Sequence, residues 1–541
     1  MRTIYCIIAT LILAGFTASS LAQEVSIPDP GLNAAIRAAL QKPSGPLTEQ
    51  DLLGLTILEA RSRNVSSIAG LEVARNLVSL NLQINNLTNF SLPNTLTNLT
   101  VLDLRVNSLT NCSFPGGLMK LDTLILESNQ LANLTFPAGL TRLASLDLSH
   151  NLFASFTLPS NLTSLSFLDL GFNGLTNVSL PSGLTNLIGL AIRGNRILAD
   201  LNLPQGLTAL ETLDIDNNAL SHVSLPVGMK SLLRLSLNDN ELFSLLLPAG
   251  MTNLVNLFLN RNHLDSLSLP ADLAKLVFLE LTLNQLTNLT VPGSLTALTE
   301  LHLPLNHLTS FTLQSGLTHL ANVDLFENAL TSITLPPGLI ALTNLDLGLN
   351  QLTSFTMPPG ATNLTTLSFF SNELTNLHLA TDMKKLNLLS LSGNRLTSLD
   401  LPSGLTSLAF LNLNGNQLAN LTLPPDMQQL LGLFVDGNPL ATLVLSEPLA
   451  ATNLAGTVTS LRNQGVSVFT YPLAIKLISP HQAAGAFGFT LAGPPGVYII
   501  SGSADLTTWN ELGMATNILG SAFFADSTAS LSARKFYRAR Q

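Results

Sequence analysis

Leucine and asparagine recur along this chain in one fixed frame. The stretch Leu77-Val-Ser-Leu80-Asn-Leu82-Gln-Ile-Asn85-Asn-Leu87 has the form L-x-x-L-x-L-x-x-N-x-L. The L-x-L alternation predicts a short β-strand that turns its leucines inward and the residue between them outward. The asparagine that follows, called the ladder residue below, falls where the chain must bend.

The frame returns every 22 residues, with one step of 23 residues between Asn195 and Asn218. Counted backwards, Arg63 holds the ladder position of a degenerate first repeat, which gives 18 repeats, 17 of them with Asn. One repeat buries too little apolar surface alone, so neighbouring repeats must stack as a solenoid. The ladder asparagines are Asn85, Asn107, Asn129, Asn151, Asn173, Asn195, Asn218, Asn240, Asn262, Asn284, Asn306, Asn328, Asn350, Asn372, Asn394, Asn416 and Asn438.

At these residues the chain resembles the leucine-rich-repeat family, over about residues 52–445. The resemblance implies a horseshoe or arc of parallel strands along a concave face. It also implies that each ladder Asn bonds the backbone of adjacent coils, a coil being one repeat. Later in each coil, stretches such as Leu396, Leu399 and Leu401 before Pro402 and Gly404 predict a second short strand or extended segment on the convex side.

Both open ends of a solenoid need a cover. Asp29 and Pro30 are typical of a helix start, and Thr48 with Asp51 gives a second, looser start. We therefore expect a helical N-terminal cap at residues 23–51, similar to that of internalin-like bacterial repeat proteins. Residues 446–472 are expected to close the other end with a helix over 449–463 and a final strand.

Residues 473–541 lose the 22-residue frame and show short alternating stretches, such as Phe487 to Leu491 and Val497 to Ile500. They predict a small β-sandwich-like domain, loosely similar to C-terminal modules of secreted bacterial proteins. Its single tryptophan, Trp509, is either a core residue, the commoner case, or a platform for a sugar.

The first 22 residues have the make-up of a secretory signal peptide. Arg2 precedes an apolar stretch from Ile4 to Ala18, and small residues precede a cut near Ala22. We expect a secreted or cell-surface protein without a transmembrane segment in the mature chain. The chain carries a net charge of −9, which argues against nucleic acid as a partner. Cys112 would then be the one cysteine left, a small buried side chain without a disulfide partner.

No recognised catalytic or phosphate-binding motif occurs, so we expect no enzyme and no cofactor. The histidines are scattered, and His302 and His307 are the nearest pair. His302 is expected on the concave strand and His307 at the turn. No carboxylate-rich set accompanies them, so no metal site is predicted and ordinary solvated histidines are the favoured interpretation.

The best candidate chemistry lies on the concave strands, at the positions six, four and two residues before each ladder residue. Twelve acidic and four basic residues occupy these positions. They either keep a leucine-rich surface soluble or serve recognition. The predicted ligand-binding residues are Phe258, Phe278, Glu280, Glu300, His302, Asp324 and Phe326, and a secondary acidic patch comprises Asp147, Asp169 and Asp214. Aromatic anchors with charged rims are typical of protein-binding surfaces, provided that the rings do not turn sideways onto neighbouring coils.

Two functions remain open. The chain is either a binding scaffold that recognises a protein or glycan through its concave face, or a structural spacer or envelope-matrix protein without a specific ligand.

Overall fold

A computed structural model describes residues 23–483, 486–529 and 534–541. The predicted signal peptide, residues 1–22, lies outside the described residues. The chain divides into two compact units, residues 1–195 and 196–541, and each is described by itself. The division falls inside the one coil that has 23 residues instead of 22.

Unit 1 begins with two helices, α1 (Pro30–Ala39) and α2 (Glu49–Leu53), followed by one 3-10 turn, η1 (Leu71–Val73). The Asp29 carboxylate caps α1 by accepting the N–H of Leu32 at 2.9 Å. Thr48 and Asp51 form a reciprocal capping box on α2. The predicted helical N-terminal cap is confirmed.

The predicted strands of unit 1 are all present, and each pairs in parallel with its neighbour one coil away. Leu80 of one coil aligns with Leu58 and Leu102 of the coils beside it, and all three are fully buried. The strands are β1 (Ile57–Glu59), β2 (Ser79–Asn81), β4 (Val101–Asp103), β6 (Thr123–Ile125), β7 (Ser145–Asp147), β9 (Phe167–Asp169) and β11 (Gly189–Ala191). The second half of the coils adds β3 (Asn89–Ser91), β5 (Asn111–Ser113), β8 (Ser155–Thr157) and β10 (Asn177–Ser179). Cys112 of β5 is buried, which raises the pKa of its thiol to about 12.

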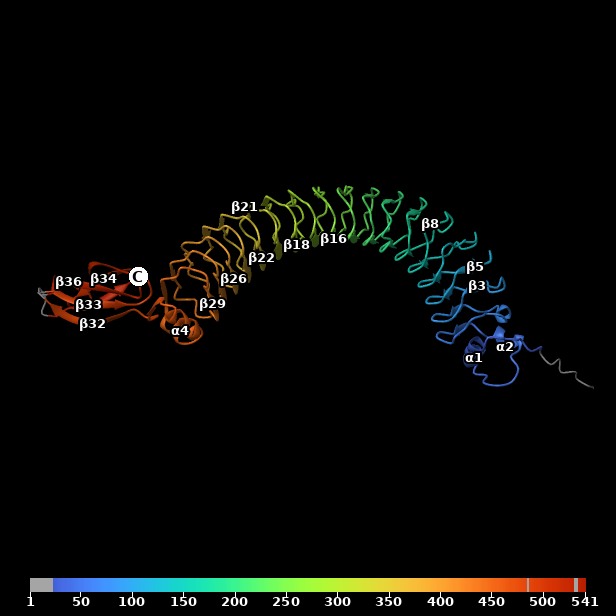
Figure 1. Cartoon of the computed structure of the whole chain (residues 1–541), viewed down its shortest axis with the longest axis horizontal. Coiled ribbons are helices and arrows are strands. Elements are labelled where there is room, and N and C mark those ends of the chain that lie inside the picture. The colour runs from blue at the N-terminus through green and yellow to red at the C-terminus, as the bar shows by residue number, and fades with distance from the viewer. Residues whose placement is uncertain (1–22, 484–485, 530–533) are drawn as a thin grey trace, which may run out of the picture. The chain divides into compact units, whose positions relative to one another are not determined.

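Unit 2 continues the same architecture, with its strand face along the inner side of its curve (Figure 1). These strands are β13 (Thr212–Asp214), β15 (Arg234–Ser236), β16 (Asn256–Phe258), β17 (Phe278–Glu280), β18 (Glu300–His302), β20 (Asn322–Asp324), β22 (Asn344–Asp346), β24 (Thr366–Ser368), β26 (Leu388–Ser390), β27 (Phe410–Asn412) and β29 (Gly432–Phe434). The second row comprises β12 (Asp200–Asn202), β14 (His222–Ser224), β19 (Ser310–Thr312), β21 (Ser332–Thr334), β23 (Ser354–Thr356), β25 (Asn376–His378), β28 (Asn420–Thr422) and β30 (Thr442–Ser446).

The predicted leucine-rich-repeat solenoid is confirmed. The described residues contain 18 strands at the L-x-L positions, one for each repeat counted in the sequence. The predicted second strand is also present, but it forms only in some coils and pairs mostly in twos.

The ladder asparagines join successive coils through their side-chain amides. Asn240 is an example: its Oδ1 accepts the N–H of Leu220 at 3.2 Å, and its Nδ2 donates to the carbonyl of Ile215 at 3.0 Å. Both partners belong to the preceding coil. Nδ2 also donates to the carbonyl of Leu237 in its own coil at 3.1 Å, so one buried amide satisfies backbone groups on both sides of the bend.

The residue before each ladder Asn bends the chain through the left-handed region of φ. This column contains Asn217, Asp239 and Gly393, which tolerate that conformation, but also Leu283 and Leu305, both with φ 57°. The sequence frame did not reveal this requirement, because large side chains occupy the position as freely as glycine.

The cap at the end of the solenoid differs from the expectation. Two helices, α3 (Glu447–Ala451) and α4 (Ala455–Asn463), replace the single helix predicted over 449–463. Thr452 leaves the helical region, with φ −115° and ψ −100°. Leu454 just after this break is fully buried. The final strand is present as β31 (Ser467–Tyr471), parallel to β30.

The last part of unit 2 is a small antiparallel β module of two three-stranded sheets, which confirms the predicted β-sandwich-like domain. One sheet contains β32 (Lys476–Ala483), β33 (Ala486–Ala492) and β36 (Ser521–Asp526). The other contains β34 (Gly496–Ser503), β35 (Asn510–Asn517) and β37 (Phe536–Arg540). Phe489, Leu491, Tyr498 and Ile500 form the core between them.

Candidate functional site

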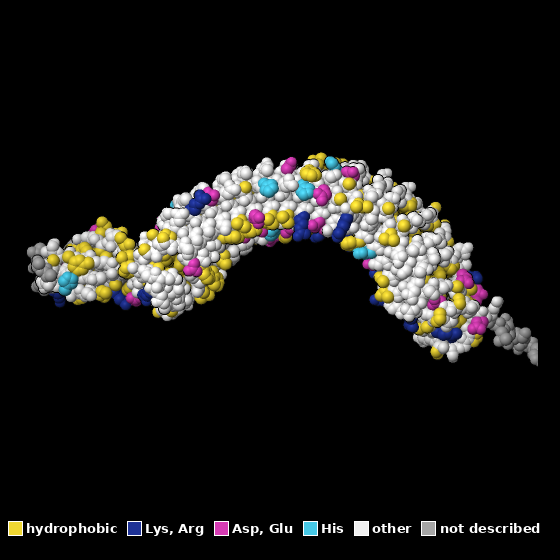
Figure 2. Space-filling view, in the orientation of Figure 1, with side chains coloured by type: hydrophobic (Ala, Val, Ile, Leu, Met, Phe, Trp, Pro, Cys, Tyr) yellow, Lys and Arg dark blue, Asp and Glu magenta, His cyan; other side chains and the backbone are white. Residues whose placement is uncertain are grey.

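Four side chains on neighbouring strands of unit 2 form a stacked row on the strand face, called the aromatic patch below. Phe258 and Phe278 have ring centroids 5.6 Å apart, and the ring of His302 stacks on Phe278 at 5.4 Å. Arg234 places its guanidinium carbon 4.3 Å from the centre of the Phe258 ring. Figure 2 shows hydrophobic and basic side chains side by side along this inner edge.

The register of the strands explains why these four side chains meet. Arg234 and Phe278 lie six residues before their ladder Asn, whereas Phe258 and His302 lie four residues before theirs. The row therefore zigzags between two columns across β15, β16, β17 and β18. Adjacent parallel strands lie about 4.8 Å apart, within reach of aromatic side chains on one face.

Carboxylates border the aromatic patch. Glu300 lies 3.2 Å from Nε2 of His302, and the carboxylate of Glu280 accepts a hydrogen bond from Asn260 Nδ2. Asp324 pairs in register with His302 and accepts the N–H of Phe326 at 3.0 Å. Burial raises the pKa of Asp324 above its usual range, although the Phe326 hydrogen bond opposes this.

The structure modifies the expected site in three ways. The rings of Phe258 and Phe278 are half-buried, because they pack sideways on one another and under Arg234. Phe326 makes its aromatic contact with Phe370, at 5.7 Å, and so belongs to a second pair further along the solenoid. Arg234, one of the four basic residues of the strand face, joins the site through its contact with Phe258, which the sequence did not predict.

All six aspartates that lie four residues before a ladder Asn have a local structural role. The carboxylates of Asp103, Asp147, Asp169, Asp214, Asp324 and Asp346 each accept the backbone N–H two residues later. Such turns end the strand and satisfy a backbone donor. Much of the acidity of the strand face therefore arises from the way each strand ends.

The secondary acidic patch is partly neutralised. Asp147 and Asp169 are register partners on β7 and β9 of unit 1. Asp169 is buried, and its carboxylate lies 3.6 Å from the Arg193 guanidinium. Asp214 ends β13 of unit 2, where its carboxylate accepts the N–H of Asp216 at 3.2 Å. Within the described residues no group of three histidine, cysteine or acidic side chains is placed to hold a metal ion.

A polar column lies beside the aromatic patch, two residues before the ladder positions. Asp216 accepts the N–H of Asn238 at 2.7 Å, Asn238 Oδ1 accepts that of Asn260 at 2.8 Å, and Asn260 Oδ1 accepts that of Thr282 at 2.8 Å. These bonds connect four successive coils and fix the strand ends that carry Phe258 and Glu280.

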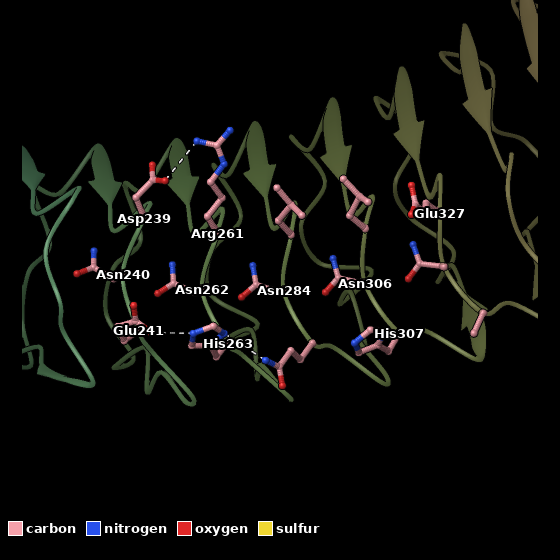
Figure 3. A pocket seen from close by; sticks show the side chains of 15 residues that line it. Asp239, Asn240, Glu241, Arg261, Asn262, His263, Asn284, Asn306, His307 and Glu327 are labelled. Carbon is pink, nitrogen blue, oxygen red and sulfur yellow. Dashed lines mark hydrogen bonds and ion pairs between the residues drawn. The ribbon is translucent and has the colours of Figure 1, made fainter.

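A second hollow surface of unit 2 lies beyond the strand ends, where no site was expected from the sequence, since only the strand face was considered there. This lateral groove has a volume of about 820 Å³ and runs along five successive coils. Ladder residues form its floor, with a row of side chains on either side (Figure 3). Asp239, Arg261, Leu283, Leu305 and Glu327 form the first row; Glu241, His263, Gln285, His307 and Ala329 form the second. The available signal was the leucine directly before Asn284 and before Asn306, at a position where other coils carry Asn, Asp or Gly.

Charged side chains pair with one another at the first end of the lateral groove. Arg261 lies 3.3 Å from Asp239, and Nε2 of His263 lies 2.7 Å from the carboxylate of Glu241. Gln285 Nε2 lies 3.1 Å from the other ring nitrogen of His263. His307 is exposed in the groove while His302 is half-buried in the aromatic patch, so the two histidines serve different surfaces.

Trp509 of the C-terminal module is not a core residue. The favoured interpretation from the sequence, which placed Trp509 in the core of the module, is therefore wrong. It is half-buried, the guanidinium carbon of Arg538 lies 4.3 Å from its ring centre, and its indole N–H donates to the Leu506 carbonyl at 3.1 Å. Phe489 and Tyr498, from two of the short alternating strands, occupy the core of the module instead.

A family model described as BspA type leucine-rich-repeat region (6 copies) matches residues 82–191, 171–278, 256–345 and 330–434. Those matches cover more than half of the chain. The chain belongs to the BspA-type leucine-rich-repeat family. No curated protein matches it in sequence.

Several solved structures are similar to this chain. YopM from Yersinia enterocolitica is 25% identical with a TM-score of 0.52, covering 76% of this chain and 91% of YopM. An internalin, InlF from Listeria monocytogenes, is 23% identical with a TM-score of 0.43, covering 67% and 99%. The Arabidopsis receptor kinase HAESA, solved with a peptide hormone and a co-receptor, is 23% identical with a TM-score of 0.41, covering 77% and 84%. No helix of the described residues is both long and apolar enough to cross a membrane.

Proposed function

We propose that this BspA-type protein is a secreted or cell-surface binding scaffold, without catalytic activity, that binds a partner protein through the aromatic patch. The row of Arg234, Phe258, Phe278 and His302 carries the proposal. These side chains lie on the strand face, away from the leucine core, so the fold does not require rings at these positions.

The composition of the patch suits a protein partner. Aromatic and arginine side chains dominate the binding energy of protein interfaces, and carboxylates at the rim mainly adjust association rate. Phe258 and Phe278 are held by contacts on both sides, so they lose little side-chain entropy when a partner covers them. Glu280 and Glu300 at the rim favour a partner with basic groups around an apolar centre.

The test uses the mature chain, residues 23–541, immobilised and exposed to the medium in which its source organism lives. We expect one protein to be captured reproducibly, and its purified form to bind in solution. Phe258→Ala with Phe278→Ala should weaken that binding at least about 30-fold, since truncated anchors cost more than about 2 kcal/mol.

A matched control is available in the same two columns. Phe167 lies six residues before Asn173 and Phe434 lies four residues before Asn438, and both rings are exposed without belonging to the patch. Phe167→Ala with Phe434→Ala should leave binding intact. Equal losses in both double variants would contradict the proposed site. A glycan as the captured partner would replace the protein partner, and reproducible capture of nothing would favour the structural spacer.

A further inference from the structure

The lateral groove is a second surface, separate from the aromatic patch. Its lining residues lie one residue before, at, and one residue after the ladder positions, whereas the patch lies four and six residues before them. Five coils at about 4.8 Å per step give it a length of about 19 Å, enough for about six residues of extended chain.

Two leucines that line the groove have an unfavourable backbone conformation. Leu283 and Leu305 both have φ 57°, a region that asparagine, aspartate and glycine tolerate better. Leu283 is 40% exposed, so it adds little to the core in return. A strained, exposed apolar side chain beside a hollow suggests a role in binding.

The charges of the groove favour a basic occupant. Three carboxylates, Asp239, Glu241 and Glu327, face one guanidinium, that of Arg261. Asp239 and Glu241 already have partners within the groove. For Glu327, the described part of the chain provides neither an ion pair nor a side-chain hydrogen bond, so its charge remains available one coil beyond Leu305.

The floor itself offers few donors. Asn284 Nδ2 donates to the carbonyls of Leu259 at 2.8 Å and Leu281 at 3.1 Å, and its Oδ1 accepts the N–H of Leu264. Selectivity must therefore come from the two rows of side chains. These rows contain no Phe, Tyr or Trp on which a sugar ring could stack, which favours a peptide over a glycan.

We infer that the lateral groove binds an extended peptide segment of a partner protein, with an aliphatic side chain followed two residues later by Lys or Arg. The aliphatic side chain rests between Leu283 and Leu305. Two residues of extended peptide span about 7 Å, which matches the one and a half coils from that point to Glu327. Gln285 and His307 on the opposite row are placed to bond the peptide backbone.

Fluorescence polarisation with the full mature chain tests the inference. The probe is a fluorescein-labelled peptide, Gly-Ser-Gly-Leu-Ser-Lys-Ser-Gly, compared with versions in which Ser replaces Leu or Glu replaces Lys. We expect saturable binding of the first peptide and a loss of at least about tenfold for each of the others. Absence of saturable binding up to about 1 mM, or equal binding of all three, would overturn the inference.

Protein variants locate the binding. Leu283→Gly with Leu305→Gly should weaken binding at least about tenfold without lowering the urea midpoint, because glycine relieves the backbone. Leu283→Asn with Leu305→Asn tests the same point should the glycine pair unfold. Glu327→Gln should abolish the preference for Lys over Glu.

Ile84→Gly is the matched control. Ile84 has φ 58° and is 40% exposed, as Leu283 is, but it belongs to unit 1 and does not line the groove. An equal loss in Ile84→Gly would overturn the inference. Phe258→Ala with Phe278→Ala should bind the peptide normally, so failure at the groove and failure at the aromatic patch are distinguishable.

Discussion

The side-chain amide of Asn240 donates a hydrogen bond to the carbonyl of Ile215, 25 positions earlier, at 3.0 Å. The same asparagine accepts the N–H of Leu220, also in the preceding coil. One side chain thus satisfies a donor and an acceptor that the bend of the neighbouring coil leaves without partners. The relationship recurs in coil after coil and connects the repeat in the sequence to the cohesion of the solenoid.

Replacing Asn240 by Ala should lower the free energy of unfolding by about 1–3 kcal/mol, because buried backbone groups lose their partners. The urea midpoint at constant slope measures this loss. Asn288→Ala is the control, since Asn288 is exposed and outside the ladder. An unchanged midpoint for Asn240→Ala would contradict the structural role of the ladder.

The repeat could be predicted in full because the same short residue pattern recurs in every coil and has the same structural consequence each time. A leucine at an L-x-L position has one buried environment, and a ladder Asn has one set of backbone partners. The cap is different, since its helix breaks at Thr452, just before the buried Leu454, at a position that no repeated rule of the sequence marks. The candidate sites were harder to predict than the cap. The stacking of Arg234 on Phe258 and the groove beside Leu283 both depend on how side chains of neighbouring coils lie against one another.

The stability of the protein should depend on the hydrogen-bonding side-chain oxygen of Asp324 and not on its charge. Its carboxylate accepts the N–H of Phe326, and burial raises its pKa above the unfolded value. A carboxyl group with a raised folded-state pKa contributes less to stability once the pH exceeds its unfolded pKa, near 4. Asp324→Asn should therefore be at least as stable as the wild type at pH 7, whereas Asp324→Ala should be less stable. Thermal unfolding of the three proteins measures this, and an asparagine variant as unstable as the alanine variant would refute it.

The C-terminal module should unfold separately from the repeats. No Trp or Tyr occurs between residues 23 and 470, so the fluorescence of Trp509 reports the module, while far-ultraviolet circular dichroism reports mainly the repeats. The module has its own core around Tyr498 and Phe489. We expect urea curves from the two signals not to coincide. Coincident curves would mean that the module is joined firmly to the end of the solenoid, where Gly520 lies close to Tyr471.

Asp526 should stabilise the module in a pH-dependent manner. Burial by itself would raise its pKa, but hydrogen bonds from Lys535, Thr528 and Tyr537 outweigh burial and lower the pKa to about 2. A carboxyl group with a lowered folded-state pKa stabilises the fold above its unfolded pKa, near 4, and loses that contribution as the pH falls towards 2.

The carboxylate is 2% exposed and lies 2.7 Å from Lys535 Nζ, so its charge is only weakly screened by solvent. Asp526→Asn should therefore lower the stability of the module by about 2 kcal/mol at pH 7, and by progressively less between pH 4 and pH 2. Urea unfolding followed by Trp509 fluorescence at each pH measures the difference. Glu511→Gln is the control, because Glu511 of β35 is exposed and makes neither an ion pair nor a side-chain hydrogen bond within the described residues. A deficit of Asp526→Asn that stays constant from pH 7 to pH 2 would show that the residue acts through its shape and not through its charge.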